Sequence, residues 1–430
     1  MQPKRGYLLC LLAAVFSLSF QGQTPPPETK AIISVERLPD LERLLRENGF
    51  DLLMAWENRL YALAGPAEIE ALSRLKVLFQ FETHKFSPPL AAETLLQGGT
   101  NGDYHSYLEL ESDLQALEKT YPQLAKVHVL GSSLERRQIY AVKISDNVAA
   151  DEPEAELAFL GCHHAREWIS LEVPFLFARY LLEHYSDPAV KSIVDRSEVW
   201  IVPLVNPDGL EYSLHHYRYW RKNRRQNADG SYGVDLNRNY GLNWGYDNTG
   251  SSPNPASEVY RGAAAFSEPE TQAVRDLFLQ RRFRAMISFH SFSQVILYPW
   301  GYTDNPTDQD GLLAGIAAAM SQRMRQVNGR AYDFGRAGGS LYLTNGDTAD
   351  WSYGTAGIPS YTIELPPVDE LGGGFFNAET DIQPIFRENL PAMLYLVEWA
   401  AQNGSPGSTE SAEQKPRSPA AAGKRASKKD

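Results

Sequence analysis

Apolar residues recur along the chain in two alternating patterns: short continuous runs, and longer stretches with helical spacing. Between residues 103 and 402 these two patterns alternate, which is typical of a sheet covered by helices. The strand-like runs are Leu157–Leu160, Glu198–Val205, Arg284–Phe289 and Ser360–Leu365. The helical patterns are Tyr107–Thr120, Ser170–His184, Glu268–Arg281 and Asp310–Val327. We therefore predict an α/β domain over residues 103–402, built on a mixed twisted sheet with helices on both faces.

A smaller pattern precedes this domain, over residues 30–86. Its elements are a strand (Ala31–Glu36), a helix (Leu38–Asn48), a strand pair (Asp51–Trp56 and Arg59–Ala64), a second helix (Pro66–Leu75) and a strand (Val77–Phe81). The order β-α-β-β-α-β is that of ferredoxin-like folds. We therefore predict a small α+β domain here.

Two segments have the composition of connecting or disordered chain. Residues 87–102 are small, polar and rich in glycine, as expected for an exposed linker that a protease could cut. Residues 403–430 are rich in Ser, Ala, Pro, Lys and Glu, which predicts a disordered tail.

The first residues resemble a targeting segment. The basic pair Lys4-Arg5 precedes an apolar stretch from Tyr7 to Phe20, which is shorter than the roughly 20 residues of a membrane span. A polar, proline-rich segment follows. This pattern predicts a secretory signal peptide over residues 1–23 and a secreted protein, extracellular or periplasmic. A single membrane anchor is the alternative.

The net charge limits the classes of binding partner, and the cysteine content limits the disulfides that the chain can form. The net charge of -12 argues against nucleic acid, which requires a basic face. Outside the first residues, no stretch is apolar enough for stable membrane insertion. Of the two cysteines, Cys10 lies in the signal segment, and Leu9 before it is too large for a lipid-anchor motif. The mature chain would keep only Cys162 and could form no internal disulfide.

Three features with histidine or glutamate could carry chemistry. His164 and Glu167 follow the run Leu157–Leu160, and a spacing of three lets one turn direct both side chains at one point. His290 lies at the carboxyl end of another predicted strand, where ligands bind in open α/β sheets. Glu364 interrupts an apolar strand. Each has a structural alternative: a solvated surface pair, a structural histidine and a buried salt bridge, respectively.

Two further stretches, Tyr219–Arg224 and Gly233–Asn239, are rich in Arg and Asn. Such stretches are usually solvated faces or loops, but arginine also grips carboxylates with two hydrogen bonds. Taken together, the five features supply what metal-assisted peptide hydrolysis requires. Two histidines and one glutamate leave an open position on zinc, a further carboxylate can act as a base, and arginine can stabilise an oxyanion.

The chain resembles the M14 metallocarboxypeptidases, the carboxypeptidase A and B family, over residues 103–402. The resemblance rests on motifs in the family's order: HAREWIS, VNPDGLEY, YWRKNR, GVDLNRNY, SSPNPASEVYRG, FHSFSQVILYPWG, LYLTNGDTADWSY and YTIEL. It implies the zinc carboxypeptidase fold and a zinc-dependent exopeptidase that removes single residues from peptide or protein C-termini.

The resemblance also implies a role for each residue at the catalytic centre. His164, Glu167 and His290 would bind one Zn²⁺ per chain; His163 also lies in the motif, but the H-x-x-E register selects His164. Asp235 matches the carboxylate that orients the first zinc histidine. Glu364 matches the catalytic glutamate, and Arg221 matches the arginine that stabilises the tetrahedral oxyanion.

Further positions match substrate contacts. Asn237 and Arg238 match the pair that binds the terminal carboxylate, and Tyr342 matches the tyrosine that closes over it. Arg166 and Ser291 match residues that meet upstream substrate residues. Ala349 and Gly301 match the floor and wall of the pocket for the terminal side chain. Because neither can neutralise a cation, we expect apolar or aromatic C-terminal residues, although Asp347 nearby could change this preference.

Residues 30–86 resemble the family's inhibitory pro-segment in position and pattern. Because residues 87–101 contain no Lys or Arg, a trypsin-like activating protease would have to cut at or before Lys85. We expect a monomer. Two alternatives to a peptide carboxypeptidase remain: a hydrolase of cell-wall peptides or acyl-amino acids, and a zinc-stabilised binding module without catalytic activity.

Overall fold

The computed structural model describes residues 101–368 and 374–403, together with residues 31–81 except for 37, 39–40, 42–43, 46–49 and 57–58. The predicted signal segment (1–23), residues 87–100 of the linker and residues 404–430 of the tail lie outside the described residues. Among the helices of the described ranges, none has the length and apolarity needed to cross a bilayer.

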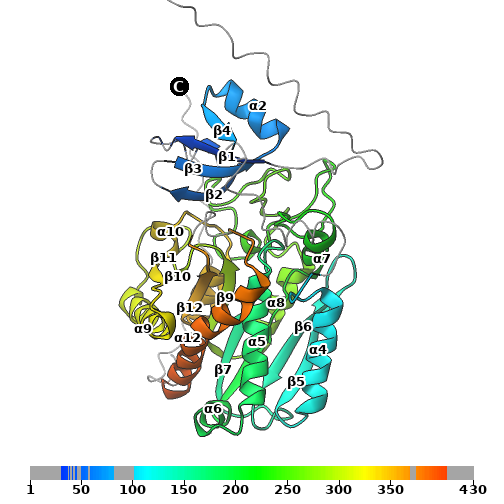
Figure 1. The fold of residues 1–430 in the computed structure, drawn as a ribbon, viewed down its shortest axis with the longest axis vertical. Helices are drawn as coiled ribbons and strands as arrows, with labels where there is room; N and C mark the ends of the chain where they lie inside the picture. The colour runs from blue at the N-terminus through cyan, green and yellow to red at the C-terminus, as the bar shows by residue number, and fades with distance from the viewer. Residues whose placement is uncertain are drawn as a thin grey trace, which may run out of the picture.

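A mixed eight-stranded sheet forms the centre of the large domain, in the order β11-β10-β12-β9-β7-β8-β6-β5 (Figure 1). Its strands are β5 (Ala125–Ser132), β6 (Gln138–Ile144), β7 (Ala155–Leu160), β8 (Ser197–Val202), β9 (Phe283–Ser291), β10 (Val295–Tyr298), β11 (Asp333–Arg336) and β12 (Ser360–Leu365). The four central strands, β12, β9, β7 and β8, run parallel to one another. Their carboxyl ends therefore meet at one edge of the sheet, where ligands of such folds bind.

Helices cover both faces of this sheet. They are α4 (Tyr107–Thr120), α5 (Ile169–Glu183), α6 (Pro188–Val194), α7 (Pro207–His215), α8 (Pro269–Gln280), α9 (Asp310–Asn328), α10 (Ala337–Ser340), α11 (Thr348–Ala356) and α12 (Ile382–Gln402), with short 3₁₀ turns at Leu236–Arg238 and Glu379–Asp381. In Figure 1, α4, α5 and α12 lie along one face.

Two hydrophobic cores explain why the central strands carry apolar residues on both faces. In β7, Leu157 and Phe159 pack into the core shared with α5 and α12, whereas Ala158 and Leu160 pack into the core shared with α8. Successive side chains of a strand point to opposite faces, so a strand buried on both faces has no polar face. The predicted fold class is confirmed.

Most predicted elements of the large domain are found within two residues of their expected bounds. The strand predicted over Glu198–Val205 is shorter than expected and ends at Val202, before Pro203. The long helix α12 was not predicted; it contains Pro391, whose ring normally interrupts a helix. Its buried side chains nevertheless pack along the main core.

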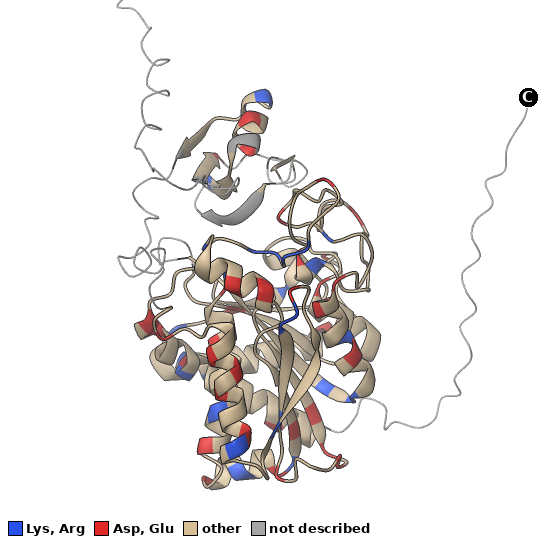
Figure 2. Ribbon diagram, turned by 90° about the vertical axis from the view of Figure 1, so that its right-hand side faces the viewer, with Lys and Arg blue, Asp and Glu red and all other residues tan. Residues whose placement is uncertain are grey.

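The small N-terminal domain contains an antiparallel sheet in the order β2-β3-β1-β4. Its elements are β1 (Ala31–Glu36), β2 (Asp51–Trp56), β3 (Arg59–Ala64), α2 (Pro66–Arg74) and β4 (Phe79–Phe81), and Leu41, Leu44 and Leu45 are helical within the predicted first helix. The order agrees with the predicted ferredoxin-like pattern, although β4 begins two residues late. Figures 1 and 2 both place this sheet beyond the carboxyl ends of the large domain's parallel strands.

Candidate active site

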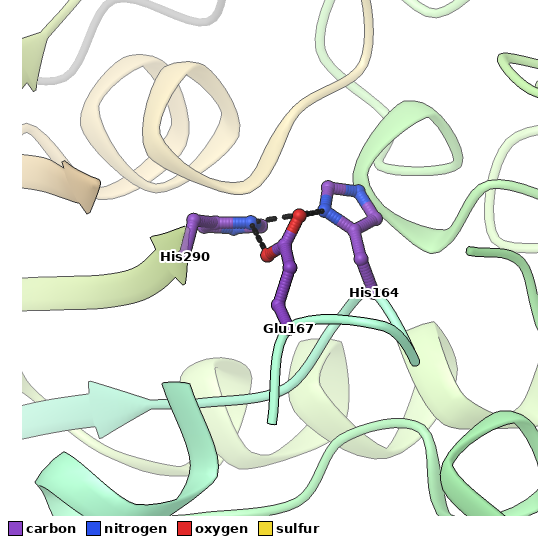
Figure 3. A group of neighbouring side chains, drawn as sticks. All are labelled: His164, Glu167 and His290. Carbon is purple, nitrogen blue, oxygen red and sulfur yellow. Dashed lines mark hydrogen bonds and ion pairs between the residues drawn. The ribbon is translucent and has the colours of Figure 1, made fainter. Parts of the chain in front are cut away.

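Three buried side chains converge at the carboxyl ends of β7 and β9 (Figure 3). His164 Nδ1 lies 2.8 Å from Glu167 Oε1, His290 Nδ1 lies 3.0 Å from Glu167 Oε2, and the two Nδ1 atoms are 3.1 Å apart. His164 and Glu167 come from the loop after β7, and His290 is part of β9. The predicted group is therefore assembled from segments that lie more than 120 residues apart in the sequence.

The chain can turn sharply after β7 because Gly161 has no side chain. A Cβ atom there would lie 2.2 Å from the Ser170 carbonyl oxygen and 2.7 Å from that of Pro203. The next residue, Cys162, is buried with a left-handed φ of 52°. This turn brings the H-x-x-E segment back across the end of the sheet.

The donor atoms fit a metal ion better than they fit a hydrogen-bonded cluster. The second nitrogen of His164, Nε2, lies 3.1 Å from Asp235 Oδ1 and donates to it, so a neutral ring directs its Nδ1 lone pair at Glu167. Burial, followed by the charge of Arg221, lowers the pKa of His164 and favours this neutral ring. The lone pairs of His164 Nδ1 and Glu167 Oε1 face each other, so a cation is required between them. Neighbouring ligand atoms around a tetrahedral zinc ion lie about 3.3 Å apart.

Asp235 joins the histidine to Arg221. Its Oδ2 accepts from Arg221 Nε (3.1 Å) and Nη2 (2.9 Å), and its Oδ1 accepts from the Asn237 backbone. Burial alone would raise the pKa of Asp235, but Arg221 and His164 hold it well below its usual value. The carboxylate is therefore charged and fixes the ring of His164, as partners of metal-binding histidines do.

Glu364 lies beside His290, because β12 and β9 pair in parallel with these two residues in register. Its side chain is partly exposed and faces the pocket described below. Burial raises the pKa of Glu364 to about 8, against the opposing effect of His290. A dication at the three donor atoms would lower this pKa and favour the carboxylate form.

A pocket opens next to the converging side chains. Seven of the predicted site residues line it: His164, Asn237, Arg238, His290, Tyr342, Ala349 and Glu364. The Asn237 amide oxygen accepts from the Thr348 backbone and hydroxyl, which turns its nitrogen toward His290. The Arg238 guanidinium is held by the Gly250 and Asn237 carbonyl oxygens and lies 5.9 Å from the Tyr342 ring centre.

Comparisons with known proteins agree with this geometry. The sequence profile of zinc carboxypeptidases, peptidase family M14, matches residues 110–392. The chain belongs to the zinc carboxypeptidase family. A zinc carboxypeptidase of Saccharothrix mutabilis subsp. capreolus is 31% identical over 430 residues, covering 93% of this chain and 98% of that protein. Carboxypeptidase B of Astacus astacus is 34% identical over 292 residues, covering 66% of this chain and 93% of that enzyme.

A solved structure extends the likeness to three dimensions. The crystal structure of carboxypeptidase A from Helicoverpa armigera matches with a TM-score of 0.75 at 27% identity, covering 88% of this chain and 98% of that chain. The protein is therefore a metallocarboxypeptidase, a hydrolase that cleaves C-terminal peptide bonds with one zinc ion. The predictions of family, activity and cofactor are confirmed.

The pocket of this carboxypeptidase differs from the expectation at Gly301, which is not among its lining residues. A Cβ atom on Gly301 would lie 2.1 Å from Thr344 Oγ1 and 2.8 Å from Asp347 Oδ2. These two side chains therefore occupy the space beside the glycine and line the pocket themselves. Asp350 lines it too, while accepting from the Gly301 and Tyr302 backbone.

Arg166 and Ser291 are not among the residues that line the pocket. The Ser291 backbone donates to Glu167 Oε2 at 3.3 Å. The Arg166 guanidinium lies 4.1 Å from the ring centre of Phe375, and Phe375 meets Phe292 edge to face at 4.8 Å.

Several pocket residues were not predicted. Thr362 precedes Glu364 by two positions, and the period of a strand could have placed both on one face. Ala337 and Leu341 belong to or follow the short helix α10, whose sequence AGGS carries no helical signal. His163 is buried behind the site, where it contacts the hydroxyls of Tyr240 and Thr348.

Proposed function

We propose that this carboxypeptidase releases single apolar or aromatic residues from the C-termini of peptides. The observation that carries the proposal is the pocket itself. It joins Glu364 and the metal-binding group on one side to Arg238, Asn237 and the small Ala349 on the other. An apolar side chain fits beside Ala349, while the two polar side chains suit a terminal carboxylate, which an internal residue lacks.

In this proposal His164, Glu167 and His290 hold the zinc. Zinc held there would act as a Lewis acid on the scissile carbonyl. Asn237 and Arg238 bind the substrate's terminal carboxylate, and Tyr342, next to Arg238, covers the bound end. The bond to be cleaved then lies between the pocket and the zinc ligands, so binding places it for attack.

Glu364 moves the proton in this mechanism. Its carboxylate accepts a proton from the attacking water, whose oxygen bonds to the scissile carbonyl carbon. As the C–N bond breaks, Glu364 returns that proton to the leaving nitrogen. Arg221, whose Nη1 lies 3.9 Å from Glu167, is placed to stabilise the negative oxygen of the tetrahedral intermediate.

Of the two aspartates that line the pocket, Asp350 accepts from the Gly301 and Tyr302 backbone, which leaves Asp347 as the residue that could oppose an apolar preference. Its Oδ1 accepts from the Asp350 backbone and its Oδ2 from Thr344 Oγ1 (2.6 Å), so internal donors use both oxygens. Burial raises the pKa of Asp347, which also weakens its charge. Both effects favour an apolar over a cationic terminal side chain.

The test is amino-acid release from N-blocked peptides that differ only in the last residue. We expect Phe, Leu or Tyr to be released faster than Arg or Lys, with Glu364→Gln as the inactive control. Ala349→Asp should raise the relative release of Lys and Arg. Faster release of Arg than Phe by the unmodified enzyme would overturn the preference. If a zinc-bound chain releases nothing, cell-wall peptides are the next substrates to test.

We further propose that residues 30–86 inhibit the enzyme until an activating protease removes them. The position of the small sheet beyond the strand ends that carry the site supports this proposal (Figure 1). Cleavage at or before Lys85 should then raise activity, and equal activity with and without residues 30–102 would rule inhibition out.

We also propose that residues 1–23 direct export and that the mature enzyme is a monomer. The apolar stretch after Lys4-Arg5 supports the first part. N-terminal sequencing of protein from the culture medium or periplasm should find the chain beginning after the signal segment. Sedimentation of that protein should give the mass of one chain.

A further inference from the structure

One buried histidine beside the site has no part in the proposed mechanism. His163 precedes the metal-binding His164 and is 0% exposed. Its Nδ1 lies 3.3 Å from Ser288 Oγ, and its Nε2 lies 2.8 Å from the Tyr240 hydroxyl and 3.2 Å from Thr348 Oγ1. Both ring nitrogens therefore face hydroxyl groups, which offsets the cost of burying a polar ring.

Ser288 connects this histidine to the metal-binding group. It is buried on β9, two positions before His290, so both side chains point to the same face of the strand. Ser288 Oγ lies 3.1 Å from His290 Nε2 and 3.3 Å from His163 Nδ1. The His163 and His290 rings are nearly parallel, at 17°, with their centres 5.5 Å apart. One hydroxyl thus bridges two stacked imidazole rings.

The direction of these hydrogen bonds follows from the metal-binding role of His290. Its Nδ1 faces His164 Nδ1 and Glu167 Oε2, so this nitrogen must keep its lone pair to bind a metal ion. The ring hydrogen is then on Nε2 and donates to Ser288 Oγ. The Ser288 hydroxyl hydrogen is left to donate to His163 Nδ1, and the ring hydrogen of His163 is on Nε2, facing the hydroxyl groups described above.

Ser288 is the better placed of the two polar groups near His290 Nε2. The other is Asn237 Nδ2, at 3.4 Å, which is itself a donor because the Asn237 oxygen accepts from Thr348. His164 differs from His290 in this respect, since its second nitrogen donates to the charged Asp235. A neutral hydroxyl is a weaker acceptor, but it becomes stronger when it donates its own hydrogen to a further group.

We propose that His163 and Ser288 are positioning residues for the zinc ligand His290, joined to it in one chain of hydrogen bonds. Ser288 accepts from His290 and fixes the plane of its ring, as partners of metal-binding histidines do. His163 strengthens that acceptor by taking the Ser288 hydrogen. The proposal rests on the zinc ligands proposed above. Because His163 acts through the Ser288 hydroxyl, its effect on zinc should depend on that hydroxyl.

The test measures the zinc affinity of the full chain, by competition with a chelator, for Ser288→Ala, His163→Leu and the double variant. Alanine removes the acceptor for His290, and leucine fills the space of the imidazole without its nitrogens. We expect the affinity to fall about tenfold in Ser288→Ala and about threefold in His163→Leu. The double variant should lose no more than Ser288→Ala alone, because the hydroxyl through which His163 acts is already absent.

Ser360→Ala is the matched control. Ser360 is a buried serine at the start of the neighbouring strand β12, and its hydroxyl donates to the Ile358 carbonyl oxygen (2.9 Å) instead of meeting a zinc ligand. This variant also loses one buried hydrogen bond, but its zinc affinity should be unchanged. An equal fall in Ser360→Ala, no fall in Ser288→Ala, or additive losses in the double variant would overturn the proposal.

His163→Gln covers the case in which His163→Leu does not fold. The glutamine amide keeps an acceptor for the Ser288 hydroxyl and a donor for the Tyr240 hydroxyl, so zinc affinity should stay within about twofold of the unmodified chain. A fall of about tenfold in this variant would also overturn the proposal. His290→Ala separates the proposal from the ligand assignment on which it rests. If His290→Ala binds zinc as tightly as the unmodified chain, the assignment itself fails, and the proposal with it.

Discussion

Buried charges gather at both ends of the parallel strands, but the two groups are built differently. At the amino ends, Lys143 Nζ donates to Glu198 Oε1 (2.8 Å), and Arg281 donates to Glu198 (2.9 Å) and Glu156 (2.7 Å). Glu198 and Glu156 therefore each meet a base. At the carboxyl ends, both oxygens of Glu167 face imidazole nitrogens, and Asp235 keeps the facing nitrogen of His164 as an acceptor.

The difference separates a structural charge cluster from a functional one. Both groups use buried carboxylates and nitrogen bases on adjacent strands, so residue type and burial alone do not tell them apart. What differs is whether each acceptor meets a donor. Donors matched to acceptors neutralise one another and hold the fold together, whereas acceptors directed at one another form a binding site for a cation.

The largest effect should come from removing the proposed base. Glu364→Gln should lower kcat by about 10²–10⁴-fold, because the amide cannot accept the proton of the attacking water. Zinc content and the urea unfolding midpoint should change little, since the Glu364 side chain is partly exposed at the pocket. Kinetics on one blocked peptide, with zinc measured in the same samples, checks this. A variant with normal kcat would remove Glu364 from the mechanism.

Breaking the charge network at the amino ends should instead lower stability and leave activity unchanged. Lys143→Met leaves Glu198, which is 0% exposed, with Arg281 as its remaining charged partner and the Glu152 backbone as a further donor. We expect a loss of about 3 kcal/mol in the free energy of unfolding, because a buried carboxylate loses a charged partner. Urea denaturation measures this loss, and kcat of the folded enzyme should be unchanged. A fall in kcat without a fall in stability would contradict the separation of the two groups.

A second His–Glu pair, in which the glutamate is buried and the histidine is partly exposed, shows why the sequence could not identify the metal-binding pair. His105 Nδ1 lies 2.8 Å from Glu172 Oε2, the same distance as between His164 and Glu167. Nothing in the local sequence distinguishes His105, whereas His164 was found through its motif. Each histidine also has an aspartate at its second nitrogen, Asp235 for His164 and Asp113 for His105. The deciding feature is a third donor atom, because His290 Nδ1 lies 3.1 Å from His164 Nδ1 and 3.0 Å from Glu167 Oε2.

The sequence predicted the bounds of an element best where one hydrophobic period, helical or strand-like, applies along its whole length. The strand Ser360–Leu365 and the helix Tyr107–Thr120 were predicted with their observed bounds, because each shows one clear pattern. The helix α12 was missed because Pro391 opposes the helical pattern that its buried face imposes. The pocket wall was predicted at Gly301, but the side chains that fill this space, Thr344 and Asp347, come from a segment about 45 residues away.

The His105–Glu172 pair should give a pH-dependent stability that the metal-binding pair does not. Although burial lowers it, the pKa of His105 is raised from 6.5 to about 9 by Glu172. Because the folded-state pKa exceeds the unfolded one, this stability is fully present below pH 6.5 and is lost as the pH rises through 9. The loss amounts to about 3 kcal/mol.

Urea unfolding of the unmodified chain and of His105→Gln, between pH 6 and 9.5, isolates this contribution from other titrating groups. The difference in unfolding free energy between the two proteins should be largest at pH 6 and should shrink toward pH 9.5. Parallel curves would show that the pair does not hold a proton, and the contrast with His164 would then be lost.

The smallest effect should come from changing Asp235, which links His164 of the metal-binding group to Arg221. Asp235→Asn keeps the shape of the side chain but removes the negative charge that accepts from His164 Nε2 and Arg221. The imidazole then becomes a weaker donor to zinc, so zinc affinity should fall about 10–100-fold. Competition with a chelator measures this affinity directly, without reference to activity.

Asp229→Asn is the control for this change, because Asp229 is an exposed aspartate near the same segment and makes only a turn with Ser231. It should leave zinc affinity unchanged. If Asp235→Asn lowered stability but bound zinc normally, Asp235 would resemble the acids at the amino ends, a structural partner for Arg221. A selective loss of zinc affinity would instead show that Asp235 belongs to the metal site at the carboxyl ends.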